Sequence, residues 1–218
     1  MPRAASTLAV IDFETTGISP GQGARATEVA AVLVRGGRIV GRYASLMHSG
    51  AWVSPFIEQL TGISNAMLRD APSAAQVMRE VGRFTAGLPL VAHNAAFDRG
   101  FWQAEALRAG LGEDPAHRFA CTVLLSRRLY PQAPNHRLGT LAALHGLPRS
   151  GRAHRALADA EVTAHLLLQI VSDVSSRFSA QLCQREVDHG LLCALQRSPA
   201  GQLQRCVARY GRDAATAA

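Results

Sequence analysis

A short apolar run that leads directly into a helical pattern constrains this fold more than any other stretch of the chain. Residues 88–92 have the composition of a buried strand. Asn94 is a residue type that favours the N-cap of a helix, and Phe97 and Phe101 follow it at helical spacing. A buried strand followed at once by a helix indicates an α/β fold. We therefore expect Asp98 in the first turn of a helix, close to the end of a strand in the sheet.

The N-terminal part of the chain carries the pattern of three antiparallel strands. Residues 7–13 are apolar on both faces until Asp12 interrupts the run, which is typical of a central strand. Residues 27–34 and 38–47 form two further runs, joined by Arg35-Gly36-Gly37. Two adjacent glycines readily take the positive φ angles of a tight turn. The pattern predicts a hairpin beside the central strand.

Helices alternate with two further strands in the rest of the chain. Together with the hairpin, this alternation predicts an α/β fold with a mixed five-stranded sheet, antiparallel in its first three strands and then parallel, flanked by helices. The expected elements are short helices that begin at Ser54-Pro55 and Ser64-Asn65, a helix at 73–86, the strand at 88–92 with a helix to about residue 109, a strand at 118–122 with a helix to residue 128, and helices at 138–145 and 156–174.

The character of the sequence changes after residue 174, and we expect a domain at residues 1–174 followed by a C-terminal helical extension at residues 175–218. A second helix of the extension should begin after Ser198-Pro199. The extension could be a pair of helices packed on the domain, or a docking segment for a partner protein. The apolar residues that can line its first helix are Leu182, Val187, Leu191 and Leu195.

The charge of the chain favours a polyanionic partner but does not assign one. The formal net charge is +7, and every one of the 23 basic residues is arginine, a good phosphate ligand. A GC-rich genome would give the same arginine content without selection for binding. The four cysteines form no CxxC pair, and the sequence has no recognisable signal peptide or membrane-spanning run. We expect a reduced, cytoplasmic protein with no membrane partner.

Two acids near the start of the chain should share one face of a strand. Asp12 and Glu14 are two residues apart, so both carboxylates project to the same side of an extended backbone. Two carboxylates that close repel each other unless a cation neutralises them. Thr15-Thr16-Gly17 follows, where hydroxyl groups and a close backbone could approach a phosphate or sugar. The pair alone is typical of an ordinary solvated strand end, and the residues that follow it make a metal site the alternative interpretation.

A third acid and a histidine occupy the start of the long helix predicted at residues 156–174. Asp159 should point toward the sheet, because Val162 and Thr163 on the same face are core positions. His154 is five residues earlier, which on a continuous helix would turn it away from Asp159. Both can share a site only if His154 lies on the loop before the helix, and Gly151 favours a loop there. A histidine placed in this way can act as a general base.

Three segments of the sequence resemble, in order and spacing, the motifs of the DEDDh family of exonucleases. They are Asp-Phe-Glu-Thr-Thr-Gly at residues 12–17, His-Asn-Ala-Ala-Phe-Asp at residues 93–98 and His-Arg-Ala-Leu-Ala-Asp-Ala at residues 154–160. The likeness covers about residues 7–170. Within that family the sequence is most similar to the epsilon-type proofreading subunits of bacterial replicative DNA polymerase. The resemblance implies a ribonuclease-H-like fold and an exonuclease domain at residues 1–174.

The resemblance also implies the roles of the acidic residues and the histidine. Two divalent ions, Mg²⁺ or Mn²⁺, would be held by Asp12, Glu14, Asp98 and Asp159, and His154 would accept a proton from the attacking water. The expected products are nucleoside 5′-monophosphates, released from the 3′ end of single-stranded DNA. The substrate contacts that the resemblance implies are Thr16, Gly17, Leu60, His93, Asn94 and Phe97.

Several functional alternatives stay open at this point. Members of the family that degrade RNA share the same five catalytic residues, so a 3′-5′ exoribonuclease is the first alternative. A catalytically vestigial polymerase-docking module is the second. The extension at residues 175–218 could bind a polymerase subunit, but the chain has no convincing clamp-binding motif. A stand-alone exonuclease is therefore as consistent with the sequence as a polymerase subunit.

Overall fold

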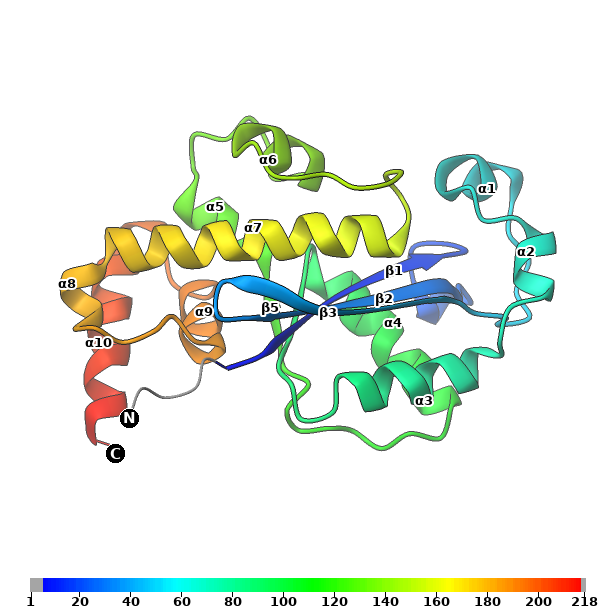
Figure 1. Cartoon of the computed structure of the whole chain (residues 1–218), viewed down its shortest axis with the longest axis horizontal. Helices are drawn as coiled ribbons and strands as arrows, with labels where there is room; N and C mark the ends of the chain where they lie inside the picture. The colour runs from blue at the N-terminus through cyan, green and yellow to red at the C-terminus, as the bar shows by residue number, and fades with distance from the viewer. Residues whose placement is uncertain (1–5, 217–218) are drawn as a thin grey trace.

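One five-stranded sheet forms the centre of the structure, a computed structural model that describes residues 6–216 (Figure 1). The strand order is β3-β2-β1-β4-β5. β2 pairs antiparallel with both β1 and β3, whereas β4 pairs in parallel with both β1 and β5. The predicted mixed sheet is confirmed. The strands are β1 (Leu8–Thr15), β2 (Ala26–Arg35), β3 (Arg38–Leu46), β4 (Leu90–Ala92) and β5 (Phe119–Cys121).

Helices cover both faces of this sheet. α7 crosses one face, with α5 and α6 packed on it, and α3 and α4 cover the other face (Figure 1). None of the helices in residues 6–216 combines the length and the apolar composition that crossing a membrane requires. The helices are α1 (Pro55–Thr61), α2 (Asn65–Arg69), α3 (Ala74–Phe84), α4 (Ala95–Arg108), α5 (Thr122–Leu129), α6 (Leu138–Leu144), α7 (Ala156–Arg177), α8 (Ser179–Leu182), α9 (His189–Leu195) and α10 (Leu203–Thr216).

Both faces of β1 are buried, as its apolar sequence predicts. Val10 belongs to the cluster beneath α7, and Ile11 belongs to the cluster formed with α3 and α4. Because side chains alternate along a strand, Asp12 and Glu14 lie on the same side of the sheet as Val10 and project toward α7. The alternation of side chains along β1 therefore places its two acids on the face of the sheet that α7 covers, where they can share a site with residues of α7.

The predicted turn and the predicted helix starts are confirmed, with one correction. Gly36 and Gly37 join β2 to β3 with φ angles of 56° and 78°. Serine side chains cap α1, α2 and α3 by accepting a hydrogen bond from the backbone N–H three residues on. Asn94 occupies the N-cap of α4, but its side chain forms no capping hydrogen bond. Its φ angle is 67°, and asparagine tolerates this left-handed conformation, which turns the chain directly from β4 into α4.

The prediction of one helix through Leu182 and Leu195 is wrong. The chain forms the short helices α8 and α9 instead, separated by a break at Cys183 and Gln184, whose φ angles are 48° and 68°. Two consecutive left-handed residues cannot continue a right-handed helix. Asp188 then caps α9 by accepting a hydrogen bond from the Leu191 N–H at 2.8 Å. The second predicted helix is present as α10.

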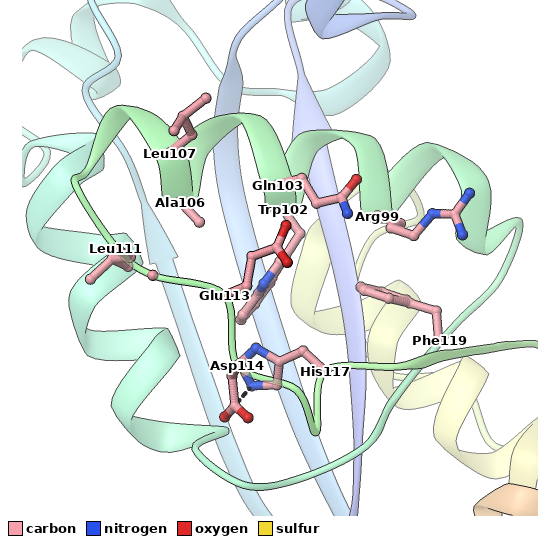
Figure 2. A pocket seen from close by; sticks show the side chains of 11 residues that line it. Arg99, Trp102, Gln103, Ala106, Leu107, Leu111, Glu113, Asp114, His117 and Phe119 are labelled. Atoms are coloured by element: carbon pink, nitrogen blue, oxygen red, sulfur yellow. Dashed lines mark ion pairs between the residues drawn. The ribbon is translucent and has the colours of Figure 1, made fainter.

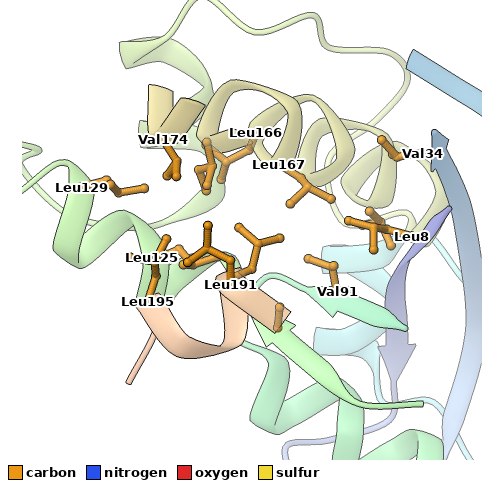
Figure 3. Close-up of a cluster of buried hydrophobic side chains, with 14 of the residues drawn as sticks. Leu8, Val34, Val91, Leu125, Leu129, Leu166, Leu167, Val174, Leu191 and Leu195 are labelled. Carbon is orange, nitrogen blue, oxygen red and sulfur yellow. The ribbon is translucent and has the colours of Figure 1, made fainter. Parts of the chain in front are cut away.

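The C-terminal helices complete the main core. Leu191 and Leu195 of α9 lie among side chains of α5 and α7 in one buried cluster (Figure 3). Gln196 covers the free edge of β5, because its Oε1 accepts from the Cys121 N–H at 2.6 Å. An uncovered edge strand would expose unpaired backbone groups. α7 continues to Arg177, so the domain boundary after residue 174 stays a prediction.

Replacing Leu191 tests whether the C-terminal helices belong to the core. Leu191→Ala should lower the free energy of unfolding by about 2–5 kcal/mol, because it leaves a cavity at a fully buried position. Leu107→Ala, at a side chain that is 78% exposed, should change it by no more than about 0.5 kcal/mol. Chemical denaturation measures both. Equally small effects would contradict a shared core.

Candidate active site

The site is built on the C-terminal end of β1. Asp12 and Glu14 are both half-buried there, on the side of the sheet that faces α7. On the neighbouring strand β2, the residue directly opposite Glu14 is Glu28, another acid. Like charges directly opposite on paired strands repel. The end of β1 therefore concentrates negative charge that the surrounding structure must balance.

Asp98 joins this acidic pair from α4. Its side chain lies in the first turn of the helix and is 2% exposed. Asp98 Oδ1 accepts a hydrogen bond from the Phe13 N–H at 3.2 Å, and Phe13 lies between the two acids of β1. This contact joins residues 85 positions apart in the sequence. The β1 acids and Asp98 are thus held at one location.

Asp159 and His154 approach from the start of α7. His154 lies on the loop before the helix, exposed and with a φ angle of 60°. Its backbone N–H donates to Asp159 Oδ2 at 3.0 Å, which fixes the loop to the first turn of α7. One potential ligand atom of each of Glu14, His154 and Asp159 lies within 4.8 Å of the others. The structure brings these three residues together in a group that could hold a metal ion.

Burial raises the pKa of all four carboxyl groups, and repulsion from neighbouring acids adds to the effect at Asp12 and Glu14. Burial raises the pKa of Asp12 well above its usual range, and the charges of Asp98, Glu14 and Asp159 raise it further. Burial, Asp159 and Glu28 raise the pKa of Glu14 to about 8. Burial also raises the pKa of Asp98 and Asp159. Carboxylate oxygens are the donors that hard divalent cations prefer, so this donor set fits such ions.

The sequence did not reveal the ion pair between Glu28 and Arg155 beside the site, although Glu28 is an acid within an otherwise apolar strand. Glu28 is buried and accepts two hydrogen bonds from the Arg155 guanidinium, at 2.7 and 3.0 Å. Glu28 Oε2 also accepts from the Ala156 N–H at 2.9 Å. The pair fixes the first residues of α7, directly after His154, to the strand beside β1.

A second buried ion pair holds the loop that follows β1. Glu105 accepts from Arg25 Nε at 2.7 Å and from Arg25 Nη2 at 2.9 Å. The Arg25 backbone N–H in turn donates to Thr16 Oγ1 at 3.0 Å. The spacing of the sequence could have revealed Glu105, because it lies two helical turns beyond Asp98 on the buried face of α4. This pair positions the loop that contains Thr16 and Gly17.

The side chains predicted to contact substrate differ in their surroundings. Leu60 is 39% exposed on α1, and Asn94 is exposed at the start of α4. His93 is half-buried, with Nδ1 2.9 Å from Thr122 Oγ1, and burial lowers its pKa to about 4. Phe97 is half-buried and packs on Phe101, with ring centroids 4.9 Å apart. Their roles toward a substrate stay predictions.

The short helix α1 forms a wall beside the histidine loop. Arg152, on the loop that carries His154, donates from Nη2 to the Gln59 carbonyl at 2.9 Å. Gly62 ends α1 with a φ angle of 74°, and a Cβ atom at this position would collide with the Arg152 guanidinium. The left-handed conformation favours glycine at residue 62, and a larger residue there would also displace the exposed Arg152 guanidinium from its contact with α1.

A separate hollow between α4 and the loop that follows it contains none of the predicted site residues (Figure 2). Its volume is about 270 Å³, and Trp102, Leu111 and Phe119 supply its apolar lining. His117 Nε2 lies 3.5 Å from Asp114 Oδ2 at its rim. This hollow mixes apolar, acidic and basic groups, whereas the cluster at the end of β1 is predominantly acidic.

The sequence is similar to bacterial exonucleases over most of its length. The family model for exonucleases matches residues 9–167. The PolC-type DNA polymerase III of Halalkalibacterium halodurans is 38% identical over 177 residues, which cover 81% of this chain and 12% of the polymerase. The 3′-5′ exonuclease DinG of Bacillus subtilis is 39% identical over 162 residues, which cover 74% of this chain and 17% of DinG. The chain thus spans a small part of these relatives.

Solved structures share the fold over most of the chain. Exonuclease X in complex with 5′ overhanging duplex DNA has a TM-score of 0.62 and 28% identity, covering 92% of this chain and 99% of that one. The nuclease domain of 3′hExo, a DEDDh family member bound to rAMP, has a TM-score of 0.67 at 20% identity, covering 78% of this chain and 93% of that one. The chain belongs to the exonuclease family, and its fold is that of the DEDDh enzymes that its motifs resemble.

Proposed function

We propose that the chain is a metal-dependent 3′-5′ exonuclease that releases nucleoside 5′-monophosphates from the 3′ end of single-stranded DNA, in proofreading or repair. One observation carries this proposal. Four carboxyl groups from β1, α4 and α7 gather at one end of the sheet, and His154 lies beside them on an exposed loop. Holding four carboxyl groups close together is unfavourable unless cations neutralise them. A module that only binds a partner does not need this cluster, so the cluster argues against a catalytically vestigial site.

The proposed roles follow from the surroundings of each residue. Asp12, Glu14, Asp98 and Asp159 hold two divalent cations, Mg²⁺ or Mn²⁺, which supply Lewis-acid stabilisation of the attacking and leaving oxygens. His154 accepts the proton of the attacking water, a role supported by its exposure and its fixed loop. Support for Thr16 and Gly17 as contacts to the terminal nucleotide comes from the rigid attachment of their loop through Arg25.

The name of the PolC-type DNA polymerase and the duplex DNA in the exonuclease X complex support DNA as the substrate. The rAMP bound to the 3′hExo domain supports RNA instead. The same five residues would serve a 3′-5′ exoribonuclease, which remains the second candidate. Leu60, an exposed apolar side chain beside the site, is proposed to contact the terminal base together with His93, Asn94 and Phe97.

Association with a polymerase is proposed as a further feature of the function. The likeness to PolC-type polymerases supports it. Residues 175–218 would have to bind such a partner through polar outer surfaces, because the apolar side chains of α9 and α10 are buried in the chain's own core. We also propose a cytoplasmic location, consistent with the four free cysteines and a DNA substrate.

A product assay tests the proposed reaction directly. Single-stranded DNA, 3′-recessed duplex DNA and single-stranded RNA of matched sequence are incubated with the full chain, with Mg²⁺ or with EDTA. We expect 5′-mononucleotides from single-stranded DNA in Mg²⁺ and no product in EDTA. Asp12→Asn should abolish release from the same substrate. Faster release from RNA would instead select the exoribonuclease, and undiminished activity of Asp12→Asn would refute the proposed site.

Removing one charge from the acidic cluster should stabilise the metal-free protein. The folded pKa of Glu14 is about 8, above its usual 4.5, so folding becomes less favourable as the pH rises between these values. Glu14→Gln removes this effect. In EDTA, the thermal midpoint of Glu14→Gln should exceed that of the wild type at pH 8 and approach it at pH 5. One kcal/mol corresponds to about 2–4 °C for a chain of this size. A lower midpoint at pH 8 would contradict repulsion in the cluster.

The Glu28–Arg155 pair can be tested by a double-mutant cycle. Arg155→Gln leaves Glu28 buried without its charged partner and should destabilise the fold by about 1.5–3 kcal/mol. Adding Glu28→Gln should recover much of this loss, because no buried charge is then unpaired. Both variants should cleave DNA more slowly with little change in KM, since the start of α7 is less well positioned. Additive effects on stability would contradict a coupled pair.

A further inference from the structure

A hollow between α9 and α10 gathers three arginines far from the acidic cluster. It has a volume of about 260 Å³, and Arg197, Arg205 and Arg209 line it, together with neutral residues that include Ser198 and Gln202. All three arginines are exposed. Of the residues that the structure describes, no acidic one lines this hollow. We call it the arginine pocket.

The walls of the arginine pocket are fixed to the core. On one side, Arg128 of α5 donates from Nε to the Ser198 carbonyl at 2.7 Å, and Ser198 Oγ donates to the Ala194 carbonyl at 3.1 Å. On the other side, α10 buries Leu203 and Val207 in the main core. Arg205 and Arg209 are four residues apart on α10, so they share its outer face. The backbone that carries the pocket's arginines is therefore held against the core.

The chemistry of the pocket selects an anion with several oxygen acceptors. Three guanidinium groups near one hollow repel one another, and a bound anion would relieve this repulsion. Guanidinium groups donate paired hydrogen bonds to phosphate oxygens. A phosphodiester backbone offers such oxygens at regular intervals, and the proposed substrate of this chain is a nucleic acid. An acidic protein is the competing partner.

The position of the pocket defines which part of a nucleic acid could reach it. The acidic cluster lies at the N-terminal end of α7, and α8, α9 and α10 pack around its C-terminal end (Figure 1). A helix of 22 residues is about 33 Å long at 1.5 Å per residue. A strand advances about 3.4 Å per nucleotide when its bases stack as in a duplex and up to about 7 Å when it is fully extended, so this separation corresponds to roughly five to ten nucleotides.

We propose that the arginine pocket binds backbone phosphates of the DNA on the 5′ side of the cleaved end, roughly five to ten nucleotides from the active site. This inference rests on the proposed function and adds a second contact to it. The contact is sequence-independent, because guanidinium groups meet only phosphates. It would hold the DNA on the enzyme while the 3′ end is shortened. A strand of only four nucleotides cannot reach from the site to the pocket.

Two charge-removing variants of the full chain test the proposal. Arg205→Gln/Arg209→Gln removes two guanidiniums of the pocket. Arg79→Gln/Arg83→Gln is the matched control, because it removes two exposed arginines with the same spacing from α3, on the opposite face of the sheet. Fluorescence anisotropy in EDTA measures binding of a 30-nucleotide strand at several salt concentrations without cleavage. Mononucleotide release from a four-nucleotide strand in Mg²⁺ measures the active site separately.

The pocket variant should bind the 30-nucleotide strand about tenfold more weakly at 0.15 M salt, and its slope of log K against log salt should be smaller by about 1.4, which is about 0.7 for each lost phosphate contact. Its rate on the four-nucleotide strand should equal that of the wild type. Arg205→Lys/Arg209→Lys should restore most of the affinity.

Equal affinities of the pocket variant and the control for the 30-nucleotide strand would overturn the proposal and favour an acidic protein as the partner. A pocket variant whose rate on the four-nucleotide strand falls as much as its affinity for the 30-nucleotide strand would also overturn it, because the effect would then be structural. If the wild type releases no product from either strand, the proposed exonuclease function fails, while the binding result in EDTA still decides the role of the pocket.

Discussion

The electrostatic repulsion among four carboxyl groups is the constraint on which the rest of the structure depends. Asp12 and Glu14 lie on one face of the central strand, and Asp98 and Asp159 reach them from helices on opposite faces of the sheet. Burial raises the pKa of every member, and repulsion raises the pKa of Asp12 and Glu14 further. Such an arrangement is unfavourable in isolation, so the surrounding fold must hold it together until cations neutralise it.

Two ion pairs, each formed by a buried glutamate and a partly exposed arginine, provide much of that support. Glu28 with Arg155 fixes the start of α7 to β2, and Glu105 with Arg25 fixes the loop after β1 to α4. Each pair joins segments that are far apart in the sequence and adds hydrogen bonds to backbone N–H groups. The acids that would bind cations therefore lie beside two other acids, Glu28 and Glu105, that are paired with arginine. The paired acids position the site, and the unpaired acids would bind the cations.

The features that repeat along the chain could be predicted, and the features that depend on distant partners could not. The apolar runs and the Gly36-Gly37 turn predicted the sheet, because the residues of a strand that are buried can be identified from the apolar positions in its own sequence. Apolar spacing could not reveal the left-handed break at Cys183 and Gln184, since neither residue type demands it. The partner of Glu28 is 127 residues away, so no local pattern identifies Arg155.

Titration calorimetry with Mn²⁺ in buffers of different ionisation enthalpy tests the central claim most directly. Cations that bind carboxyl groups with raised pKa must displace protons. At pH 7 we predict binding of two ions per chain with net proton release, which should decrease as the pH rises above about 8, the pKa to which burial and neighbouring acids raise Glu14. Binding without proton release at pH 7, or no binding at all, would contradict an acidic cluster that is held together for divalent cations.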